Sequence, residues 1–313
     1  MSYTERVLRT HLSNNNVEQE LRRVLDNLAG SAKYIGLAIR GSMRGSAGSL
    51  NTYGEEQTTL DVLADNIIRE RLQYETSFRV RELASEEQGQ IVTVERDQGR
   101  YSVTVDPLDG SSLLDVNLSV GSIFGIHDGH LLDQRSGRAS LVAAMYTLYG
   151  PETTLVYSAS DGVHEFTLDG AGNWVLAQEK IVMNETGKIY SPGGKRQDWT
   201  EHHRAFIQNI EEQGHTLRYS GALVADVNQI LMKRGGIFSY PALKEKPEGK
   251  LRLLFELQPL AFILEQAGGA ATDGKEHILD LLPQKLDQRC PIYIGSRAEV
   301  SLARQYLEIG EAK

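Results

Sequence analysis

The stretch that most constrains the fold is 101–112, with the sequence YSVTVDPLDGSS. Its first five residues are apolar or β-branched enough for a strand that is buried on both faces. Asp106 would lie at the end of that strand, and Pro107 cannot donate to a ladder, so the strand is expected to stop there. Asp109–Gly110 then makes a turn, and Ser111–Ser112 can open a helix. The stretch predicts a buried strand followed by a turn that carries two carboxylates.

Helices and strands are predicted in both halves of the chain. Apolar residues recur at helical spacing over 17–41, up to Gly41, and a second amphipathic helix over 58–74 would be capped by Thr58 or Thr59. The Gly- and Ser-rich residues 41–56 predict a mobile loop. Further strands are expected at 121–126, 153–159 and 250–256, and further helices at 224–235 and 259–267. A second half would begin near 187–199, so we expect a layered α/β protein.

Bulk composition excludes several classes of function. The 313 residues suffice for one large domain or two ordinary ones, and the net charge of −9, without a long basic run, argues against nucleic-acid binding. No apolar run is long enough to span a membrane, and the N-terminus lacks the apolar core of a signal peptide. A single cysteine, Cys290, cannot form an internal disulfide. We expect a cytoplasmic protein without a thiol switch inside one chain.

The acids of the 105–115 stretch have two interpretations. Asp106 and Asp109 are hard oxygen ligands suited to Mg²⁺, and the free N–H groups of a helix start at Ser111 favour a phosphate. The alternative is an Asx turn with a serine cap and no ligand. The spacing alone does not separate the two.

Three other acidic positions raise the same choice. Glu86 and Glu87 are adjacent like charges, which repel each other unless something positive lies near them. The alternative is that they are acids in the first turn of a helix that Ser85 caps, where the helix dipole favours them. Asp61 also suits a first helical turn. Glu256 stands in an apolar run, where a carboxylate needs a partner. With the period of a strand, Lys250, Arg252, Leu254 and Glu256 would share one face, which suits either an anionic substrate with a metal or an edge ion pair.

Other catalytic patterns are missing from the sequence. No Cys or His cluster has zinc spacing, and the adjacent His202 and His203 are expected at the surface. Neither a Walker-type lysine loop nor a G-x-S-x-G elbow is present. Because the available ligands are all oxygen, Mg²⁺ or Mn²⁺ is favoured over zinc.

Four motifs together resemble one family. ASEE, DPLDGSS, GKLRLLFE and QAGGAATDGKEHILD occur in the order and at the spacing of the class 1 fructose-1,6-bisphosphatases and their relatives, the sedoheptulose-1,7-bisphosphatases. The resemblance runs from about Glu20 to Gln305. It implies an α/β protein with a layered α-β-α-β-α sugar-phosphatase fold and two subdomains. These would be 1–187, with the metal and phosphate corner and a vestigial AMP-like region, and 188–313, which binds the sugar bisphosphate.

The resemblance also implies residue roles. The ligands of two or three Mg²⁺ ions, for which Mn²⁺ can substitute, would be Glu86, Glu87, Asp106, Asp109 and Glu256, with the backbone carbonyl of Leu108. The leaving phosphate would be held by Asp109, Gly110, Ser111 and Ser112. The attacking water would be positioned by Asp61, Glu87 and Glu55. The family usually has Asp at the position of Glu55. The second phosphate and the sugar would contact Tyr219, Tyr240 and Lys250, and Arg218 resembles an arginine lent to a neighbouring subunit.

Some residues depart from the fructose-bisphosphatase pattern. SPGGKR stands where many members have Asn-Glu-Gly-Tyr, so Gly193 replaces an asparagine that contacts the distal phosphate. YSPGG, YGEEQTTLDVLAD and ADVNQI are nearer the sedoheptulose enzymes, yet the regulatory cysteine pair of their chloroplast members is missing from GSMRGSAGSLN. Glu18 and Arg22 stand at the threonines of the AMP pocket, although Arg100–Tyr101 resembles the rest of it. We therefore expect AMP to inhibit weakly or not at all.

The implied reaction is Mg²⁺-dependent hydrolysis of the 1-phosphate of fructose 1,6-bisphosphate in carbohydrate metabolism. A sedoheptulose-1,7-bisphosphatase or a phosphatase of dual specificity is the alternative, because both sugars share the reacting end. A phosphosugar sensor without catalysis is a remote alternative, since such a protein should have lost at least one metal acid. The family also implies a homo-oligomer, by resemblance a tetramer. From charge and hydropathy we expect it to bind neither nucleic acid nor membrane.

Overall fold

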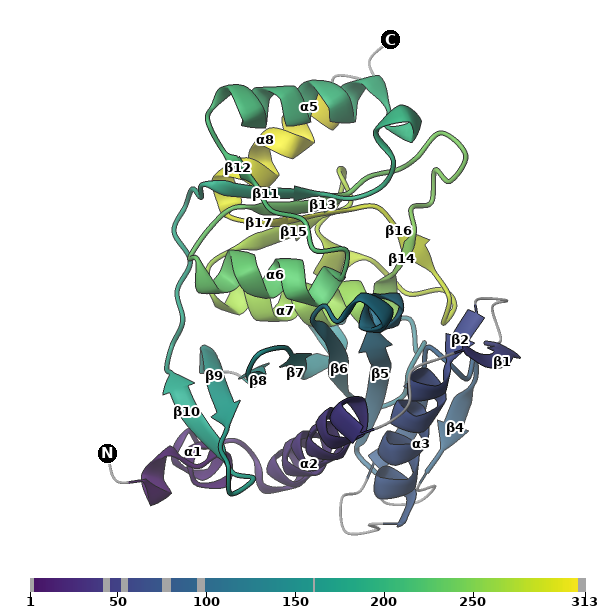
Figure 1. The fold of residues 1–313 in the computed structure, drawn as a ribbon, viewed down its shortest axis with the longest axis vertical. Coiled ribbons are helices and arrows are strands. Elements are labelled where there is room, and N and C mark those ends of the chain that lie inside the picture. Colours follow the sequence, from purple (N-terminus) through teal and green to yellow (C-terminus); the bar gives the residue numbers. More distant parts are fainter. Residues whose placement is uncertain are drawn as a thin grey trace.

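The computed structural model describes residues 3–41, 46–51, 56–74, 80–94, 99–159 and 161–308. Layers of helices and sheets alternate along the long axis of the molecule (Figure 1). The described helices are α1 (Leu8–Asn14), α2 (Gln19–Gly41), α3 (Thr59–Tyr74), α4 (Gly137–Ser140), α5 (Glu201–Glu212), α6 (Leu223–Met232), α7 (Gln258–Gln266) and α8 (Arg297–Glu308). Short 3₁₀ turns are η1 (Thr4–Arg6), η3 (Ser111–Val116), η4 (Arg196–Asp198) and η6 (Ile278–Asp280), and η5 (Leu253–Leu257) is a π-helix. The predicted α/β class is confirmed.

The large sheet has the strand order β10-β9-β8-β7-β6-β5-β3-β4. Its strands are β3 (Val80–Ser85), β4 (Ile91–Thr93), β5 (Tyr101–Asp109), β6 (Val120–Asp128), β7 (Leu141–Tyr149), β8 (Thr153–Ser158), β9 (Val163–Leu168) and β10 (Trp174–Gln178). Neighbours are antiparallel except β3 and β5, which run parallel. The carboxyl ends of β3 and β5 therefore meet at one edge of the sheet, and the acids that follow both strands are brought together there.

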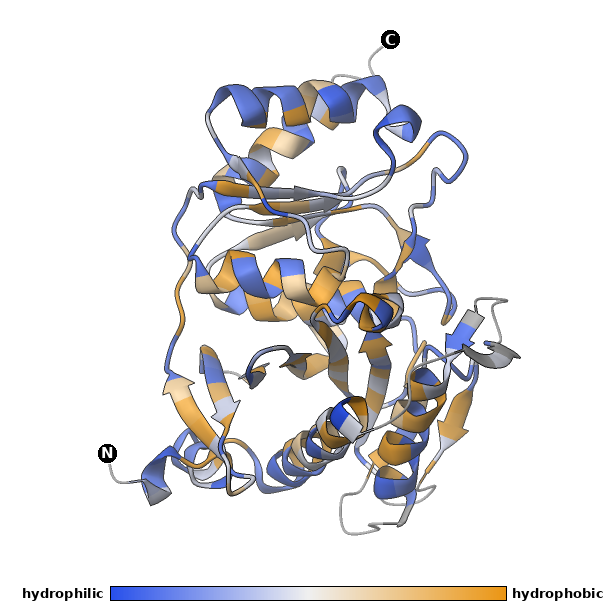
Figure 2. Ribbon diagram, in the orientation of Figure 1, coloured by the Kyte–Doolittle hydropathy of each residue, from blue (hydrophilic) through white to orange (hydrophobic). Residues whose placement is uncertain are grey.

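Both faces of the large sheet are covered, which explains the continuous apolar character of its central strands. Phe124 belongs to the core that α1, α2 and α3 form on one face, while its neighbour Ile123 belongs to the core under α6 and α7 on the other. Figure 2 shows apolar residues along the central strands and on α6 and α7. The helical spacing predicted over 17–41 buries Leu21, Val24 and Leu28 in the first of these cores.

A smaller sheet and two helices complete the stack. Its order is β12-β11-β13-β17-β15. The strands are β11 (Ile189–Pro192), β12 (Thr216–Leu217), β13 (Ile237–Tyr240), β15 (Ala270–Thr272) and β17 (Ile292–Gly295). Helices α6 and α7 fill the space between the two sheets, and α5 and α8 cover the far face of the small sheet (Figure 1). Two further pairs are β1 (Ser46–Leu50) with β2 (Glu56–Thr58), and β14 (Leu251–Arg252) with β16 (Arg289–Cys290).

Four local predictions are wrong. The strand expected over 250–256 is only β14, and the π-helix η5 follows it, because a fully buried apolar run has no periodicity that separates strand from helix. Strand β5 does not stop at Pro107 but continues to Asp109 across an irregularity in its pairing. The loop expected over 41–56 contains β1 and the first residue of β2, although 42–45 and 52–55 lie outside the described residues. His203 is buried, bonded to the Tyr293 hydroxyl at 3.0 Å.

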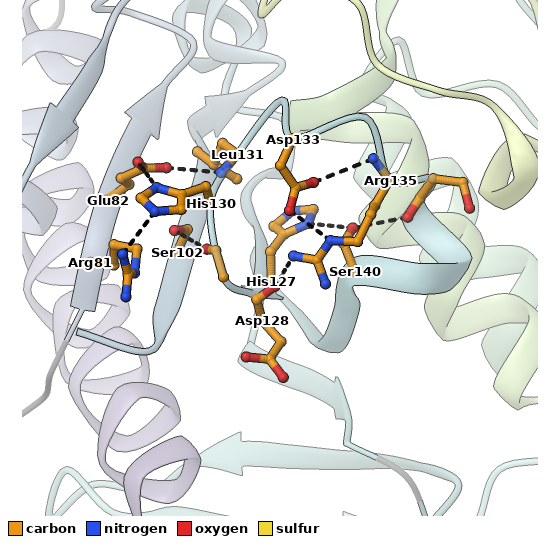
Figure 3. A network of polar contacts seen from close by, with 12 residues as sticks. Arg81, Glu82, Ser102, His127, Asp128, His130, Leu131, Asp133, Arg135 and Ser140 are labelled. Carbon is orange, nitrogen blue, oxygen red and sulfur yellow. Dashed lines mark hydrogen bonds and ion pairs between the residues drawn. The ribbon is translucent and has the colours of Figure 1, made fainter. Parts of the chain in front are cut away.

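A polar network fixes the loop between β6 and β7 (Figure 3). Buried His127 bonds through Nδ1 to the Ser140 hydroxyl at 3.1 Å. His130 lies 2.6 Å from Glu82, and the Arg135 guanidinium donates to the carbonyl oxygen of Asp128. These bonds hold Asp128 at the end of β6, beside Arg100.

Candidate active site

One cavity of about 270 Å³ lies where the large sheet, η3 and the start of η5 meet. Most of its walls are polar or charged. Its lining residues are Asn51, Asp61, Glu86, Glu87, Asp106, Leu108, Asp109, Gly110, Ser111, Ser112, Tyr219, Gly221, Leu223, Phe238, Tyr240, Lys250, Leu251, Arg252 and Glu256. Residues that are far apart in the chain therefore share one site.

The turn at the end of β5 aims both of its carboxylates by short bonds. Asp106 accepts a hydrogen bond from the Leu108 N–H at 3.0 Å, and Asp109 accepts one from the Val224 N–H, at the start of α6, at 2.7 Å. Gly110 has a φ of 79°, and a Cβ there would lie 2.5 Å from the Cβ of Ala222. Only glycine combines that backbone conformation with so close an approach, and this explains the DG pair.

Glu86 and Glu87 follow β3 in a turn, not in the first turn of a helix. Glu86 is ion-paired with the buried guanidinium of Arg252. The backbone N–H of Glu86 donates to the Val105 carbonyl oxygen at 3.0 Å. Glu87 accepts a hydrogen bond from the Gln57 amide. The positive neighbour that two adjacent acids require is therefore Arg252.

Glu256 enters the cavity from the π-helix. Its carboxylate accepts a hydrogen bond from the Arg252 N–H at 2.5 Å, which closes one tight turn of chain around the cavity. The strand face expected from period two does not exist, yet Lys250, Arg252 and Glu256 all line the cavity. Leu254, which the strand interpretation placed with them, is buried in the core instead.

The carboxylates of Asp106, Asp109 and Glu256 form a tight group. One oxygen from each lies within 4.8 Å of the others. Burial, and then neighbouring acids, raise the pKa of Asp106 well above its ordinary value, and burial is the main cause that raises the pKa of Asp109 and of Glu256 to about 7. Crowded, buried, oxygen-only ligands of this kind fit a hard divalent cation, whose charge would offset the repulsion between the acids.

Asp61, Ser111 and Ser112 also line the cavity. Thr58 and Asp61 cap the start of α3 reciprocally: Asp61 N–H donates to the Thr58 hydroxyl at 3.1 Å, and Thr58 N–H donates to the Asp61 carboxylate at 2.7 Å. Asp61 is nevertheless buried at the cavity wall, close to Ser111 and Ser112. Asp61 therefore lies in the first turn of α3 and at the cavity wall at the same time.

Three of the residues expected at the sugar end, Tyr219, Tyr240 and Lys250, also line the cavity. The Lys250 ammonium is 5.7 Å from the centre of the Tyr240 ring, and Tyr219 also lines the wall. Among the described residues that line the cavity, Arg218 is not found, and its side chain is exposed. Its backbone N–H donates to the Tyr190 carbonyl oxygen at 2.9 Å. Glu55 lies outside the described residues. A Cβ on Gly193 would lie 2.3 Å from the Tyr240 ring, so an asparagine there requires the ring to move.

Among the polar residues that line or contact the cavity, Arg252 was placed on the candidate face without a role of its own, and Gln57 and Asn51 were not singled out at all. Arg252 has a clear signal, because it lies between Lys250 and Glu256 in an apolar run. Gln57 and Asn51 belong to the Gly- and Ser-rich segment and carry no signal of their own. Gln57 lies on β2, which leads directly into α3, and Asn51 directly follows β1, the strand that pairs with β2.

Comparison with known proteins agrees with this geometry. The N-terminal domain model of fructose-1-6-bisphosphatase matches residues 1–179, and the C-terminal domain model matches residues 183–308. The curated class 1 fructose-1,6-bisphosphatase of Pelobacter propionicus is 52% identical over 301 residues, which are 96% of this chain and 92% of that protein. The one from Geobacter sulfurreducens is 50% identical over 96% of this chain and 95% of its own length.

Solved structures extend the likeness to the whole fold. Leishmania major fructose-1,6-bisphosphatase in its holo form superposes with a TM-score of 0.91 at 32% identity, and covers 96% of this chain and 98% of its own. A Toxoplasma gondii protein, provisionally assigned as a sedoheptulose-1,7-bisphosphatase, gives 0.89 at 30% identity, with 97% and 98% covered. The resemblance noted in the motifs is confirmed, and the chain belongs to the fructose-1,6-bisphosphatase family.

Proposed function

We propose that the chain hydrolyses the 1-phosphate of fructose 1,6-bisphosphate to fructose 6-phosphate and phosphate. The observation that carries the proposal is the convergence of Glu86, Glu87, Asp106, Asp109 and Glu256 on one cavity, with the Gly110–Ser112 turn beside them. The curated relatives named above are fructose-1,6-bisphosphatases. A phosphate monoester is extremely slow to hydrolyse unaided, so a site of this kind must stabilise its transition state strongly.

The oxygen-only donor set supports Mg²⁺ as the cofactor, with two or three ions per chain and Mn²⁺ as a substitute. The proposed ligands are the five acids and the backbone carbonyl of Leu108. Bound divalent cations stabilise charge on the attacking and leaving oxygens of a phosphoryl transfer. Arg252 would keep Glu86 ionised and in place between turnovers, because it is already ion-paired with that carboxylate.

The chain's own groups have separate tasks in this proposal. Asp61 and Glu87 orient the attacking water and accept its proton, helped by Glu55. The N–H groups and hydroxyls of the Gly110–Ser112 turn hold the phosphate oxygens. The water oxygen bonds to phosphorus as the bond from phosphorus to the C1 oxygen breaks. That oxygen leaves as the sugar hydroxyl after it takes up a proton.

Tyr219, Tyr240 and Lys250 would bind the second phosphate and the sugar. The ammonium of Lys250 supplies the positive charge, and the two phenols border the same wall. This end of the site decides between a six- and a seven-carbon sugar. The sedoheptulose alternative is favoured by YSPGG and by the Toxoplasma gondii neighbour.

Steady-state kinetics on the two sugars, measured side by side in Mg²⁺, test the proposal. A higher kcat/KM for fructose 1,6-bisphosphate supports it, and a higher value for sedoheptulose 1,7-bisphosphate establishes the alternative. If neither sugar releases phosphate while both bind, the chain is a sensor without catalysis.

The two parts of the chain divide this work in the proposal. Residues 1–187 supply most of the metal and phosphate corner, and 188–313 supply the sugar end together with Glu256. No described helix is both long enough and apolar enough to cross a bilayer. A cytoplasmic location remains part of the proposal.

An exposed Arg218 outside its own cavity is consistent with a proposed homotetramer in which it completes a neighbour's site. We expect Glu87→Gln and Arg218→Ala to be inactive separately, and to recover part of the wild-type activity when their subunits are mixed. In a hybrid, the Arg218→Ala subunit keeps its own Glu87 and receives Arg218 from its neighbour. Phosphate release after exchange is the measurement. No recovery despite demonstrated exchange would place Arg218 in its own subunit's site or in none.

AMP is expected to inhibit weakly. In the region that corresponds to the AMP pocket, Tyr101 donates to the Glu18 carboxylate at 2.7 Å, and Arg100 is already paired with Asp128 at 3.1 Å. A carboxylate about 4 Å from a phosphate costs about 1 to 4 kcal/mol per unit charge, which weakens binding several-fold or more. The positive charge of Arg22 offsets part of this.

Titration of AMP at fixed substrate and Mg²⁺ measures this inhibition. Glu18→Thr is the informative variant, because removing the carboxylate should increase the sensitivity to AMP. Potent, cooperative inhibition of the wild type in the micromolar range would contradict the electrostatic argument.

A further inference from the structure

A second group of metal-ligand side chains lies away from the cavity, at the edge of the large sheet. His11 comes from α1, His164 from β9, and Glu179 follows β10 directly. One ligand atom from each lies within 4.8 Å of the other two. His11 Nε2 lies 3.3 Å from a Glu179 carboxylate oxygen. The two imidazole rings are 4.5 Å apart, centre to centre.

The outer nitrogens of both rings have partners, and the inner nitrogens are contacted as well: the Asn15 amide nitrogen lies 3.0 Å from His11 Nε2, and the Lys180 N–H donates to His164 Nδ1 at 3.4 Å. His11 Nδ1 lies 2.8 Å from the Tyr157 hydroxyl, and His164 Nε2 lies 3.0 Å from the Asp161 carbonyl oxygen. A carbonyl only accepts, so the proton of His164 is on Nε2 and its lone pair is on Nδ1. If His11 donates to Tyr157 in the same way, its lone pair is on Nε2, which faces both the Asn15 amide and Glu179. Metal-binding histidines are oriented in this way by a bond at the nitrogen that does not bind the metal.

Burial favours the neutral, metal-binding form of both rings. His11 is 2% exposed and His164 is 1% exposed, and burial is the main cause that lowers the pKa of each. Glu179 is exposed, so the group opens to solvent on one side. Two nitrogens and one carboxylate are therefore available to a cation that displaces the Asn15 amide from His11 Nε2 and the Lys180 N–H from His164 Nδ1.

We propose that His11, His164 and Glu179 form a second metal site, for a borderline transition cation of the Zn²⁺ class. Two imidazoles and a carboxylate suit Zn²⁺ or Co²⁺, whereas Mg²⁺ prefers oxygen ligands and water. An ion there would join α1 to the β9–β10 edge of the sheet. The site is independent of the active-site carboxylates and does not rest on the proposed reaction.

The competing arrangement needs no metal. Tyr157 would then donate to His11 Nδ1, and His11 Nε2–H would donate to Glu179. Which tautomer is present decides between a hydrogen-bond network and a ligand set. A metal titration separates the two directly.

The experiment uses the full-length chain without a histidine tag, in saturating Mg²⁺ so that the oxygen ligands are filled. Titration with Co²⁺ should give the visible absorption bands of a nitrogen-containing, four-coordinate site, and Zn²⁺ should remove them by competition. Glu179→Gln replaces an exposed ligand, so the fold is retained. It should weaken Co²⁺ binding at least about 10-fold, by the scale known for groups that support metal sites.

Two further variants make the result specific. Glu152→Gln changes an exposed acid elsewhere on the surface and should leave the titration unchanged. Asp109→Asn disables the active-site carboxylates and should also leave the bands unchanged. The proposal is overturned if Co²⁺ gives no such bands, if Glu179→Gln binds as tightly as the wild type, or if Asp109→Asn abolishes the bands.

Discussion

Glu256→Gln is expected to lower kcat by about 100-fold or more while the protein stays folded. The substitution keeps the shape of the side chain and removes one negative charge from the group that Glu256 forms with Asp106 and Asp109. Charge stabilisation at a site of this kind contributes several kcal/mol to the transition state, and each 1.36 kcal/mol is tenfold in rate. The measurement is steady-state phosphate release in saturating Mg²⁺.

Stability should move in the opposite direction to activity. Burial, followed by the charge of Asp109, raises the pKa of Glu256 to about 7, so the ionised form destabilises the metal-free fold above that pH. Glutamine carries no charge. We therefore expect the melting temperature of metal-free Glu256→Gln at pH 8 to equal or exceed that of the wild type.

Glu165→Gln is the matched control. Glu165 is also a buried glutamate whose pKa burial raises, but it lies on β9, bonds to Gln178 and does not line the cavity. Its kcat should stay close to that of the wild type. If Glu256→Gln instead kept near wild-type kcat, Glu256 would have only the structural role that the apolar run around it also allows.

Removal of divalent metal should abolish turnover. Without a cation, the acids that line the cavity repel the phosphate they have to bind, and the charge of the transition state has no counterpart. EDTA should therefore stop phosphate release, and excess Mg²⁺ should restore it. Full turnover in metal-free buffer would rule out the proposed mechanism.

The same removal should change how stability depends on pH. Burial raises the pKa of Glu87 and Glu256 from 4.5, and of Asp109 from 3.8, to about 7. The lower pKa values apply to the unfolded chain and the value of about 7 to the folded chain. Between these pH values the folded chain binds more protons than the unfolded chain, so the free energy of unfolding falls as pH rises. The loss should begin near pH 4 and level off above about pH 7.

Urea unfolding at intervals from pH 5 to 8, with EDTA and with Mg²⁺, measures this dependence. Mg²⁺ should recover most of the stability lost at pH 8, because the cation replaces the protons that the acids give up. A metal-free stability that rises over this range would contradict the assignment of these acids to one crowded group.

Local chemistry was readable from the sequence. The buried strand at 101–105, the Asp-Gly turn and the helix start at Ser111 follow from neighbouring residues, and α2 follows from the helical spacing of Leu21, Val24 and Leu28. Because such preferences act over a few residues, a single stretch carries them. Four motifs in order were then enough to identify the family.

The tertiary structure decided what depends on contacts between distant segments. Glu256 points into the cavity from a π-helix and not from a strand, because residues 253–257 are buried on all sides and no alternation marks them. The pairing of Arg252 with Glu86 spans 166 residues, and the bond from Val224 to Asp109 spans 115. His11 and His164 meet only because α1 packs against the edge of the sheet, so their separation in the chain hides them from any search by spacing. Short-range propensity cannot encode such pairs; they exist only where the packed layers bring the strand ends and helix faces together.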